Sequence, residues 1–210
     1  MEFSKKIMEI FLFVNPLGPR CYETEKIVLD FVQERNEKVK LRFIPFVNFH
    51  TISTQLSLHP IKETTIETRN KLYMDTYETA LAFTAVSMQG KNIGRQFLMA
   101  LQKSLIEQQN KVSNKLISEI ISSLPIDTEM FLEDWHADFT KQLFLKDQKI
   151  AREMDVSQTP SLVLFSSMSS DYGSVIESTV SKEVLHGLCD SQNQKIHNLS
   201  SKKIIKSYSN

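Results

Sequence analysis

The chain has 210 residues, and 41% of them are hydrophobic, which is enough to bury the core of one compact unit. Its 25 basic and 25 acidic side chains cancel, so the charge balance offers no footprint for nucleic acid or an anionic membrane surface. The longest apolar run near the N-terminus, residues 7–14, is too short to span a membrane, and no small-residue cleavage site follows it. We therefore expect a cytoplasmic protein whose two cysteines stay reduced as thiols.

The first quarter of the chain predicts a βαβ unit. Residues 7–14 are almost continuously apolar and predict a buried strand, and the sequence NPLGP at 15–19 then predicts a turn. From Cys21 to about Asn36 apolar residues recur at helical spacing, and residues 39–48 alternate as a second strand. A strand, a helix and a second strand in this order favour parallel pairing of the two strands.

The predicted helix has an outer face of charged and polar side chains. These are Glu23, Glu25, Lys26, Asp30, Gln33 and Glu34. We expect this face to be exposed to solvent.

The middle of the chain predicts helices. Residues 50–72 are polar, rich in threonine and without a clear period, so we expect an irregular connection there, with a short helix near residues 62–69 as an alternative. Residues 73–135 carry four helical patterns joined by short polar or proline-bearing turns. Ser113 and Asp127 are expected to cap two of these helices. This stretch predicts a compact helical subdomain.

The last third of the chain predicts one longer helix and a β-hairpin. The helix covers residues 138–154, and the sequence SQTPSLVLF then leads through Thr159 and Pro160 into a strand at 162–165. Residues 174–178 predict the next strand, close enough to form an antiparallel hairpin with the first.

A final helix and a tail complete the pattern. Thr179 or Ser181 is expected to cap the helix, which should end near Leu188, and the segment beyond Asp190 is polar enough to predict a flexible tail. The order βαβ, helical insertion, ββα predicts an α/β fold with a mixed sheet.

Three features suggest a site of the kind that carries out thiol–disulfide exchange. The turn at residues 15–19 places Gly18 and Cys21 at a helix N-terminus, where free N–H groups and the helix dipole favour a thiolate. The pair Thr159-Pro160 stands directly before a strand, where an X-Pro bond can be cis. The order of the elements is the third feature.

Together these features resemble the DsbA-like branch of the thioredoxin superfamily. That branch has a thioredoxin-like fold with an inserted α-helical subdomain, and a cis-proline loop faces its Cys-x-x-Cys site. The resemblance covers about residues 7–188. It implies that residues 1–72 and 138–190 together form the thioredoxin-like domain and that residues 73–137 form the helical insertion. Residues 191–210 are expected to form a flexible C-terminal tail because of their polar composition.

Residue by residue, the sequence NPLGPRC resembles the branch's Asp-Pro-x-Cys-x-x-Cys. Asn15 stands where the family has Asp, and Pro16 matches. Gly18 stands where the family has its nucleophilic first cysteine, and Cys21 stands for the resolving second cysteine.

Within the branch, two segments resemble the YjbH/SpxH family of Gram-positive bacteria. They are AREMDVSQTPSLVLFS at residues 151–166 and AVSMQGKNIGRQFLMALQKSLI at residues 85–106. Members of that family are adaptors that present the transcriptional regulator Spx to the ClpXP protease. The resemblance therefore implies Spx and ClpXP as partners in proteolysis regulation and the stress response.

The departure at Gly18 decides between the functions that this resemblance allows. Thiol–disulfide exchange needs an attacking thiolate and a second thiol that resolves the mixed disulfide. Gly18 removes the attacker, Cys21 stands where the resolving thiol is usually buried, and Cys189 lies far from the site in this fold. Cys21 has two open readings, a buried small side chain and a reactive thiol.

We therefore expect a non-enzymatic adaptor for Spx and ClpXP with a degenerate site. Its partner-binding residues would be Asn15, Pro16, Gly18, Thr159 and Pro160, because the residue before a cis-proline offers its backbone to an extended peptide in this fold. The alternative is a thiol–disulfide oxidoreductase or isomerase with Cys21 as its catalytic residue; a glutathione-binding isomerase or transferase is a third reading.

Neither a cofactor nor a metal is expected. The five histidines are scattered, and no pair has metal-ligand spacing near a cysteine. Nucleic acid and membranes are likewise not expected as partners.

Overall fold

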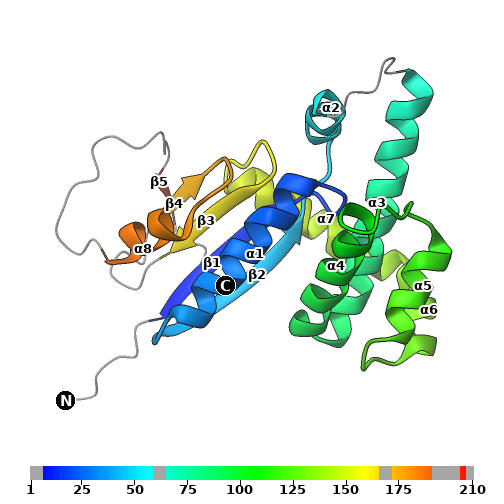
Figure 1. Cartoon of the computed structure of the whole chain (residues 1–210), viewed down its shortest axis with the longest axis horizontal. Coiled ribbons are helices and arrows are strands. Elements are labelled where there is room, and N and C mark those ends of the chain that lie inside the picture. Colours follow the sequence, from blue (N-terminus) through cyan, green and yellow to red (C-terminus); the bar gives the residue numbers. More distant parts are fainter. Residues whose placement is uncertain (1–6, 59–64, 166–171, 191–203, 207–210) are drawn as a thin grey trace.

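A mixed sheet with the strand order β2-β1-β3-β4-β5 forms the centre of the computed structural model, which describes residues 7–58, 65–165, 172–190 and 204–206 (Figure 1). The strands are β1 (Ile7–Val14), β2 (Lys38–Pro45), β3 (Ser161–Phe165), β4 (Tyr172–Ile176) and β5 (Ile204–Lys206). The helices are α1 (Pro19–Glu34), α2 (Phe49–Ser57), α3 (Ile66–Gln89), α4 (Lys91–Ile106), α5 (Asn114–Ser122), α6 (Thr128–Trp135), α7 (Asp138–Glu153) and α8 (Lys182–Asp190).

The strand pairing confirms the predicted α/β fold. Strand β1 pairs in parallel with β2, as the βαβ order requires, and antiparallel with β3. Strands β3 and β4 form the predicted antiparallel hairpin. Strand β5 pairs with β4 and lies within the segment that the sequence predicted to be a flexible tail. Its sequence, IIK, contains two β-branched residues, which favour strand pairing.

Two apolar layers cover the sheet because side chains alternate along its strands. Ile10 and Leu12 of β1 belong to the same buried cluster as Phe31 of α1. Phe13 points to the opposite face and shares a second buried cluster with Met154, which directly follows α7. Helices α1 and α8 therefore lie on one face of the sheet and α7 on the other (Figure 1).

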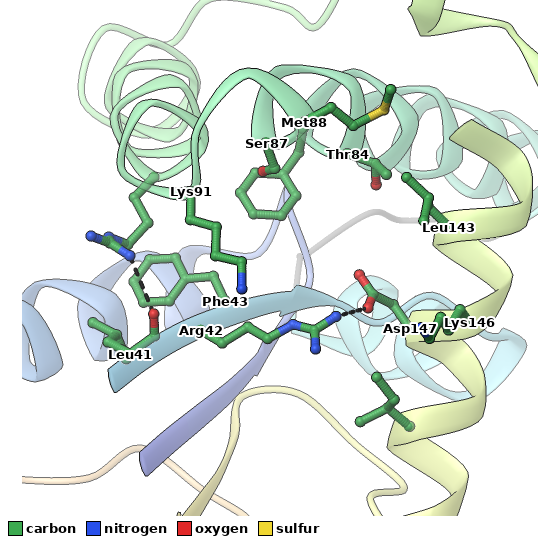
Figure 2. Close-up of a pocket in the computed structure, with 13 residues that line it drawn as sticks. Leu41, Arg42, Phe43, Thr84, Ser87, Met88, Lys91, Leu143, Lys146 and Asp147 are labelled. Atoms are coloured by element: carbon green, nitrogen blue, oxygen red, sulfur yellow. Dashed lines mark hydrogen bonds and ion pairs between the residues drawn. The ribbon is translucent and has the colours of Figure 1, made fainter. Parts of the chain in front are cut away.

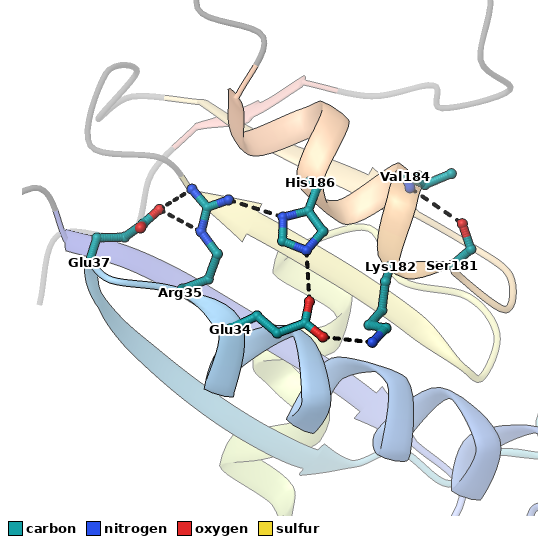
Figure 3. A network of polar contacts seen from close by, with 7 residues as sticks. All are labelled: Glu34, Arg35, Glu37, Ser181, Lys182, Val184 and His186. Atoms are coloured by element: carbon teal, nitrogen blue, oxygen red, sulfur yellow. Dashed lines mark hydrogen bonds and ion pairs between the residues drawn. The ribbon is translucent and has the colours of Figure 1, made fainter.

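A polar network joins α8 to the C-terminal end of α1 (Figure 3). Lys182 Nζ donates to Glu34 Oε1 at 2.7 Å, and His186 Nε2 lies 3.0 Å from Glu34 Oε2. Arg35 Nη1 lies 3.2 Å from His186 Nδ1. Because a guanidinium group only donates, Nδ1 accepts this bond, and the Nε2–H of a neutral imidazole donates to Glu34. Ser181 accepts from the N–H of Val184, as expected of an N-cap.

Residues 50–72 were predicted to form an irregular connection. Residues 59–64 lie outside the described part of the chain, and for the other residues of this stretch the prediction is wrong. Helix α2 begins after Asn48, whose side chain and N–H form a reciprocal capping box with Thr51. Helix α3 begins after Thr65, whose hydroxyl accepts from the N–H of Thr68, and it continues without a break to Gln89. Side-chain caps start both helices where the apolar period is weak.

The helices that follow agree better with the sequence. Ser113 caps α5 and Asp127 caps α6, as predicted. Helix α7 covers Asp138–Glu153, within one residue of its predicted end.

Helices α3 and α4 cross closely at Gly94, which predicts a loss of stability when this residue is enlarged. A Cβ atom at Gly94 would clash with Ser87 Oγ and lie 3.1 Å from Ser87 Cβ. We expect Gly94→Ala to lower the free energy of unfolding by about 1–3 kcal/mol, measured by urea denaturation.

Gly187 in α8 provides the matched control, because a Cβ atom there would meet no atom of the described residues within 4 Å. Gly187→Ala should raise the stability by about 0.5–1 kcal/mol through helix propensity. Equal stabilisation by Gly94→Ala would contradict the close helix crossing.

Candidate functional site

The candidate site lies where β1 ends and α1 begins, beside the start of β3. Asn15 follows β1, and α1 begins at Pro19. The peptide bond between Thr159 and Pro160 is cis and directly precedes β3. The side chain of Thr159 lies close enough to the thiol of Cys21 to lower its pKa, so the two predicted segments meet in space.

Hydrogen bonds to Asn15 and Gln55 hold the turn before α1. Asn15 is 2% exposed, and its Oδ1 accepts from the N–H of Leu17 at 2.9 Å. Its Nδ2 donates to Gln55 Oε1 at 2.7 Å, and Gln55 Nε2 donates to the Leu17 carbonyl at 2.9 Å. Gln55 was not singled out in the sequence, because it lies on α2 in the stretch predicted to be irregular.

The Gln55 contacts predict a loss of stability on truncation. Gln55→Ala leaves the buried Asn15 amide without its partner and should lower the free energy of unfolding by about 1–3 kcal/mol. Gln89 is the matched control, because it makes two hydrogen bonds with Asp127 at an exposed place. Urea denaturation should show a smaller loss for Gln89→Ala; an equal or larger loss would contradict the role of Gln55.

Cys21 is buried, and its thiol is neutral at physiological pH. It is 2% exposed and accepts a hydrogen bond from the N–H of Asn15 at 3.2 Å. Burial, followed by the nearby Glu25, raises the pKa of this thiol to about 12, against the opposing effects of the Asn15 N–H and the Thr159 side chain. Burial therefore outweighs the helix N-terminus, which alone would favour a thiolate.

Gly18 has no side chain to supply the first sulfur of a Cys-x-x-Cys site. The backbone at Gly18 nevertheless has a conformation that a cysteine could adopt. Its φ of −88° and ψ of 118° suit any L-residue. A Cβ atom at Gly18 would lie 3.2 Å from Cys21 Sγ and 3.3 Å from Asn15 Cβ. The site thus lacks only the side chain that would make it a dithiol.

Glu25, one helical turn after Cys21, was predicted to face solvent, and this prediction is wrong. It is fully buried, since it lies four residues from Cys21 and three from Val28 on the inner face of α1. Burial raises the pKa of its carboxyl group to about 8. At pH 7 this carboxyl group is therefore largely protonated.

Gln102 of α4 stabilises the buried carboxyl group of Glu25 through a hydrogen bond. Its Nε2 donates to Glu25 Oε1 at 2.9 Å. The other two oxygens, Glu25 Oε2 and Gln102 Oε1, have no partner among the residues that the structure describes. A protonated Glu25 can donate from Oε2 to Gln102 Oε1, which would satisfy both groups.

Cys189 does not belong to this site. Its Sγ contacts Met8 Sδ at 3.7 Å, near the start of β1, whereas Cys21 contacts Asn15 after the end of that strand. Met8 and Asn15 are seven residues apart along an extended strand, a separation of about 23 Å. Cys189 therefore cannot replace the missing first thiol.

The described part of the chain shows neither a metal-binding cluster nor a helix that could span a membrane. Among its residues, no group of three or more histidine, cysteine or acidic side chains is arranged to hold a metal ion. None of its helices combines the length and apolar character needed to cross a membrane.

Known proteins share this architecture. Residues 11–186 match the family described as Thioredoxin. The Bacillus subtilis protein named ClpXP adapter protein SpxH is 30% identical over 196 residues, which cover 86% of this chain and 66% of that protein. This chain thus spans about two thirds of the length of that curated relative.

Solved structures support the same fold. A disulfide-isomerase candidate from Nitrosomonas europaea has a TM-score of 0.64 at 15% identity, covering 88% of this chain and 96% of that one. A Pseudomonas aeruginosa DsbA variant has a TM-score of 0.59 at 13% identity, covering 90% and 86%. At these identities the likeness concerns the fold alone. The chain belongs to the thioredoxin family, with a DsbA-like fold, and is related to the SpxH proteins.

Proposed function

We propose that this chain is an adaptor that binds the regulator Spx and promotes its degradation by the ClpXP protease. Its relationship to the protein named ClpXP adapter protein SpxH supports this function. The proposal includes a cytoplasmic location, because the degradation of a transcriptional regulator takes place there. It requires no cofactor, nucleic acid or membrane.

The observation that carries the proposal is a thioredoxin-type site without an attacking thiol. Gly18 occupies the attacker's position, and Cys21 is 2% exposed with a pKa raised to about 12. A mixed disulfide with a client needs a reactive thiolate. A site without one binds its partner reversibly, which suits a protein that must release its client to a protease.

The proposed client surface is centred on Thr159, which is half-buried. The other four predicted residues, Asn15, Pro16, Gly18 and Pro160, are buried and support it from beneath. In thioredoxin folds the residue before the cis-proline offers its main chain to an extended peptide. Thr159 holds that position here, and its contact with Cys21 joins it to the turn that contains Gly18. The surface therefore combines two chain segments that are far apart in sequence.

The degradation of purified Spx by ClpXP, with and without this chain, tests the proposal. The parent should accelerate degradation, and Cys21→Ser should do so equally, because a serine hydroxyl still accepts the hydrogen bond from Asn15. Thr159→Arg should lose the acceleration, whereas Ser157→Arg, at an exposed place two residues away, should retain it. No acceleration, together with no binding of Spx in calorimetry, would overturn the proposal.

Thiol chemistry through Cys21 is the alternative, and it predicts different assay results. The buried, neutral thiol leads us to expect that the parent and Cys21→Ser are equally inactive in insulin reduction and dithiol oxidation. Activity in the parent that Cys21→Ser abolishes would favour the oxidoreductase or isomerase.

A further inference from the structure

The outer edge of β2 borders a groove that the candidate site does not use. Strand β2 stands first in the sheet order, so only β1 pairs with it among the strands that the structure describes. A cavity of about 320 Å³ lies between this edge and helices α3, α4 and α7 (Figure 2). A second cavity of about 680 Å³ adjoins it and shares Leu41, Arg42 and Arg95 with the first. Together the two cavities follow β2 for most of its length.

Main-chain groups of β2 point into this groove. The N–H of Phe46 donates to the carbonyl of Val14, so even-numbered residues of this segment turn their main-chain groups toward β1. Odd-numbered residues therefore turn theirs outward. Arg95 Nη1 donates to the outward carbonyl of Leu41 at 3.2 Å, and Gln148 Nε2 donates to that of Pro45 at 2.7 Å.

Phe43 lies between these two capped carbonyls and lines the first cavity. Its N–H and carbonyl point outward by the same alternation, and neither has a hydrogen-bond partner among the residues that the structure describes. An unpaired strand edge of this kind is a template for an extended peptide. The edge is interrupted on both sides of Phe43: Arg95 occupies the Leu41 carbonyl, and Gln148 occupies the Pro45 carbonyl and the N–H of Val47.

The charges around the groove are unbalanced. Its two carboxylates are already paired, since Glu9 binds Lys40 at 2.6 Å and Asp147 binds Arg42 (Figure 2). Three further cations line the cavities without an ion pair in the described part of the chain. These are Lys91, Arg95 and Lys146.

Arg95 carries the strongest sign of a missing anion. Burial lowers the pKa of its guanidinium group, and its two hydrogen bonds go to uncharged acceptors, the Leu41 carbonyl and Asn92 Oδ1. A partly buried cation is usually paired with a negative charge. A ligand that brings carboxylates would supply it.

The lining also contains apolar side chains, beside the polar Thr84 and Ser87, and suits alternating side chains. Phe43, Phe83, Leu143 and Ile150 contribute to the first cavity. A strand places successive side chains on opposite sides, so a peptide with alternating apolar and acidic residues can bury one set and direct the other to the cations.

We propose that the outer edge of β2, with the two cavities beside it, binds an extended acidic peptide segment of a partner protein. A peptide N–H replaces Arg95 at the Leu41 carbonyl, and the released guanidinium group binds a peptide carboxylate. The main-chain groups of Phe43 pair with the same peptide. This site is separate from the Thr159-Pro160 surface and does not depend on the identity of the client.

Selection from a random nine-residue peptide library displayed on phage, against the full chain, tests this inference. Selected peptides should combine alternating apolar residues with Asp or Glu. Their affinity, measured by fluorescence anisotropy, should fall about tenfold or more in Lys91→Glu/Arg95→Glu, because two charge-assisted hydrogen bonds are lost. Lys103→Glu is the matched control, since it reverses an exposed charge on the same helix outside the groove.

The remaining outcomes also decide the question. N-methylation at alternate peptide residues should abolish binding in one of its two registers, as main-chain pairing requires. No enrichment of acidic peptides, or equal binding to Lys91→Glu/Arg95→Glu, overturns the inference. Competition by free glutamate would indicate a small-anion site instead. If Thr159→Arg abolishes peptide binding and Lys91→Glu/Arg95→Glu leaves it unchanged, the peptide binds at the proposed client surface. The two proposals can therefore fail independently.

Discussion

The free energy of unfolding is expected to fall by about 2–5 kcal/mol between pH 5 and pH 9 through Glu25 alone. Burial raises the pKa of this carboxyl group from 4.5 to about 8 in the folded state. Above pH 4.5 the unfolded chain ionises at Glu25 while the folded chain stays protonated. The stability that Glu25 contributes is thus fully present below pH 4.5 and is lost as the pH rises through about 8.

Urea denaturation at pH 5, 7 and 9 measures this effect. Glu25→Gln should remove most of the pH dependence, because a neutral amide can form both hydrogen bonds with Gln102 at every pH. Glu23→Gln, an exposed neighbour on the same helix, should leave the pH dependence unchanged. A parent and a Glu25→Gln variant with the same pH profile would show that Glu25 is already ionised in the folded state.

The second large effect is expected at Gly18. The Gly18→Cys variant should form a disulfide with Cys21 in a glutathione buffer, with one glutathione disulfide reduced to two glutathione thiols. The Cβ at this position lies 3.2 Å from Cys21 Sγ, and in a disulfide the corresponding separation is about 3 Å. The introduced thiol would also stand at a helix N-terminus, which favours its thiolate.

Mass spectrometry after alkylation measures the disulfide. Gly18→Cys should lose two free thiols on oxidation, and insulin reduction should appear that the parent lacks. Gly187→Cys provides the control, because no sulfur or other atom of the described residues lies within 4 Å of its Cβ. If both thiols of Gly18→Cys stay free in the oxidised buffer, the site does not retain a dithiol geometry.

The sequence predicted those elements whose apolar period is strong. Residues 7–14 and the helix after Cys21 indicated the βαβ unit, and the hairpin followed from the strand after Pro160. Helices α2 and α3 were missed at their starts because Asn48 and Thr65 begin them through side-chain caps within polar sequence.

The inner contacts of the site could not be predicted, since they join residues distant in sequence. Glu25 was placed on the solvent face because charge alone suggested it, and its partner Gln102 lies 77 positions away. The contact between Gln55 and Asn15, 40 positions apart, could not be predicted for the same reason. The sequence did identify part of the site, because the motifs that contain Cys21, Thr159 and Pro160 resemble those of a known family.

Calorimetric titration of purified Spx into this chain tests the central claim most directly, which is that the site recognises a client without thiol chemistry. Parent and Cys21→Ser should bind with the same affinity, and Thr159→Arg should bind at least about tenfold more weakly, since a bulky side chain would block the main chain before the cis-proline. Binding that is lost in Cys21→Ser but unaffected by Thr159→Arg would contradict the account.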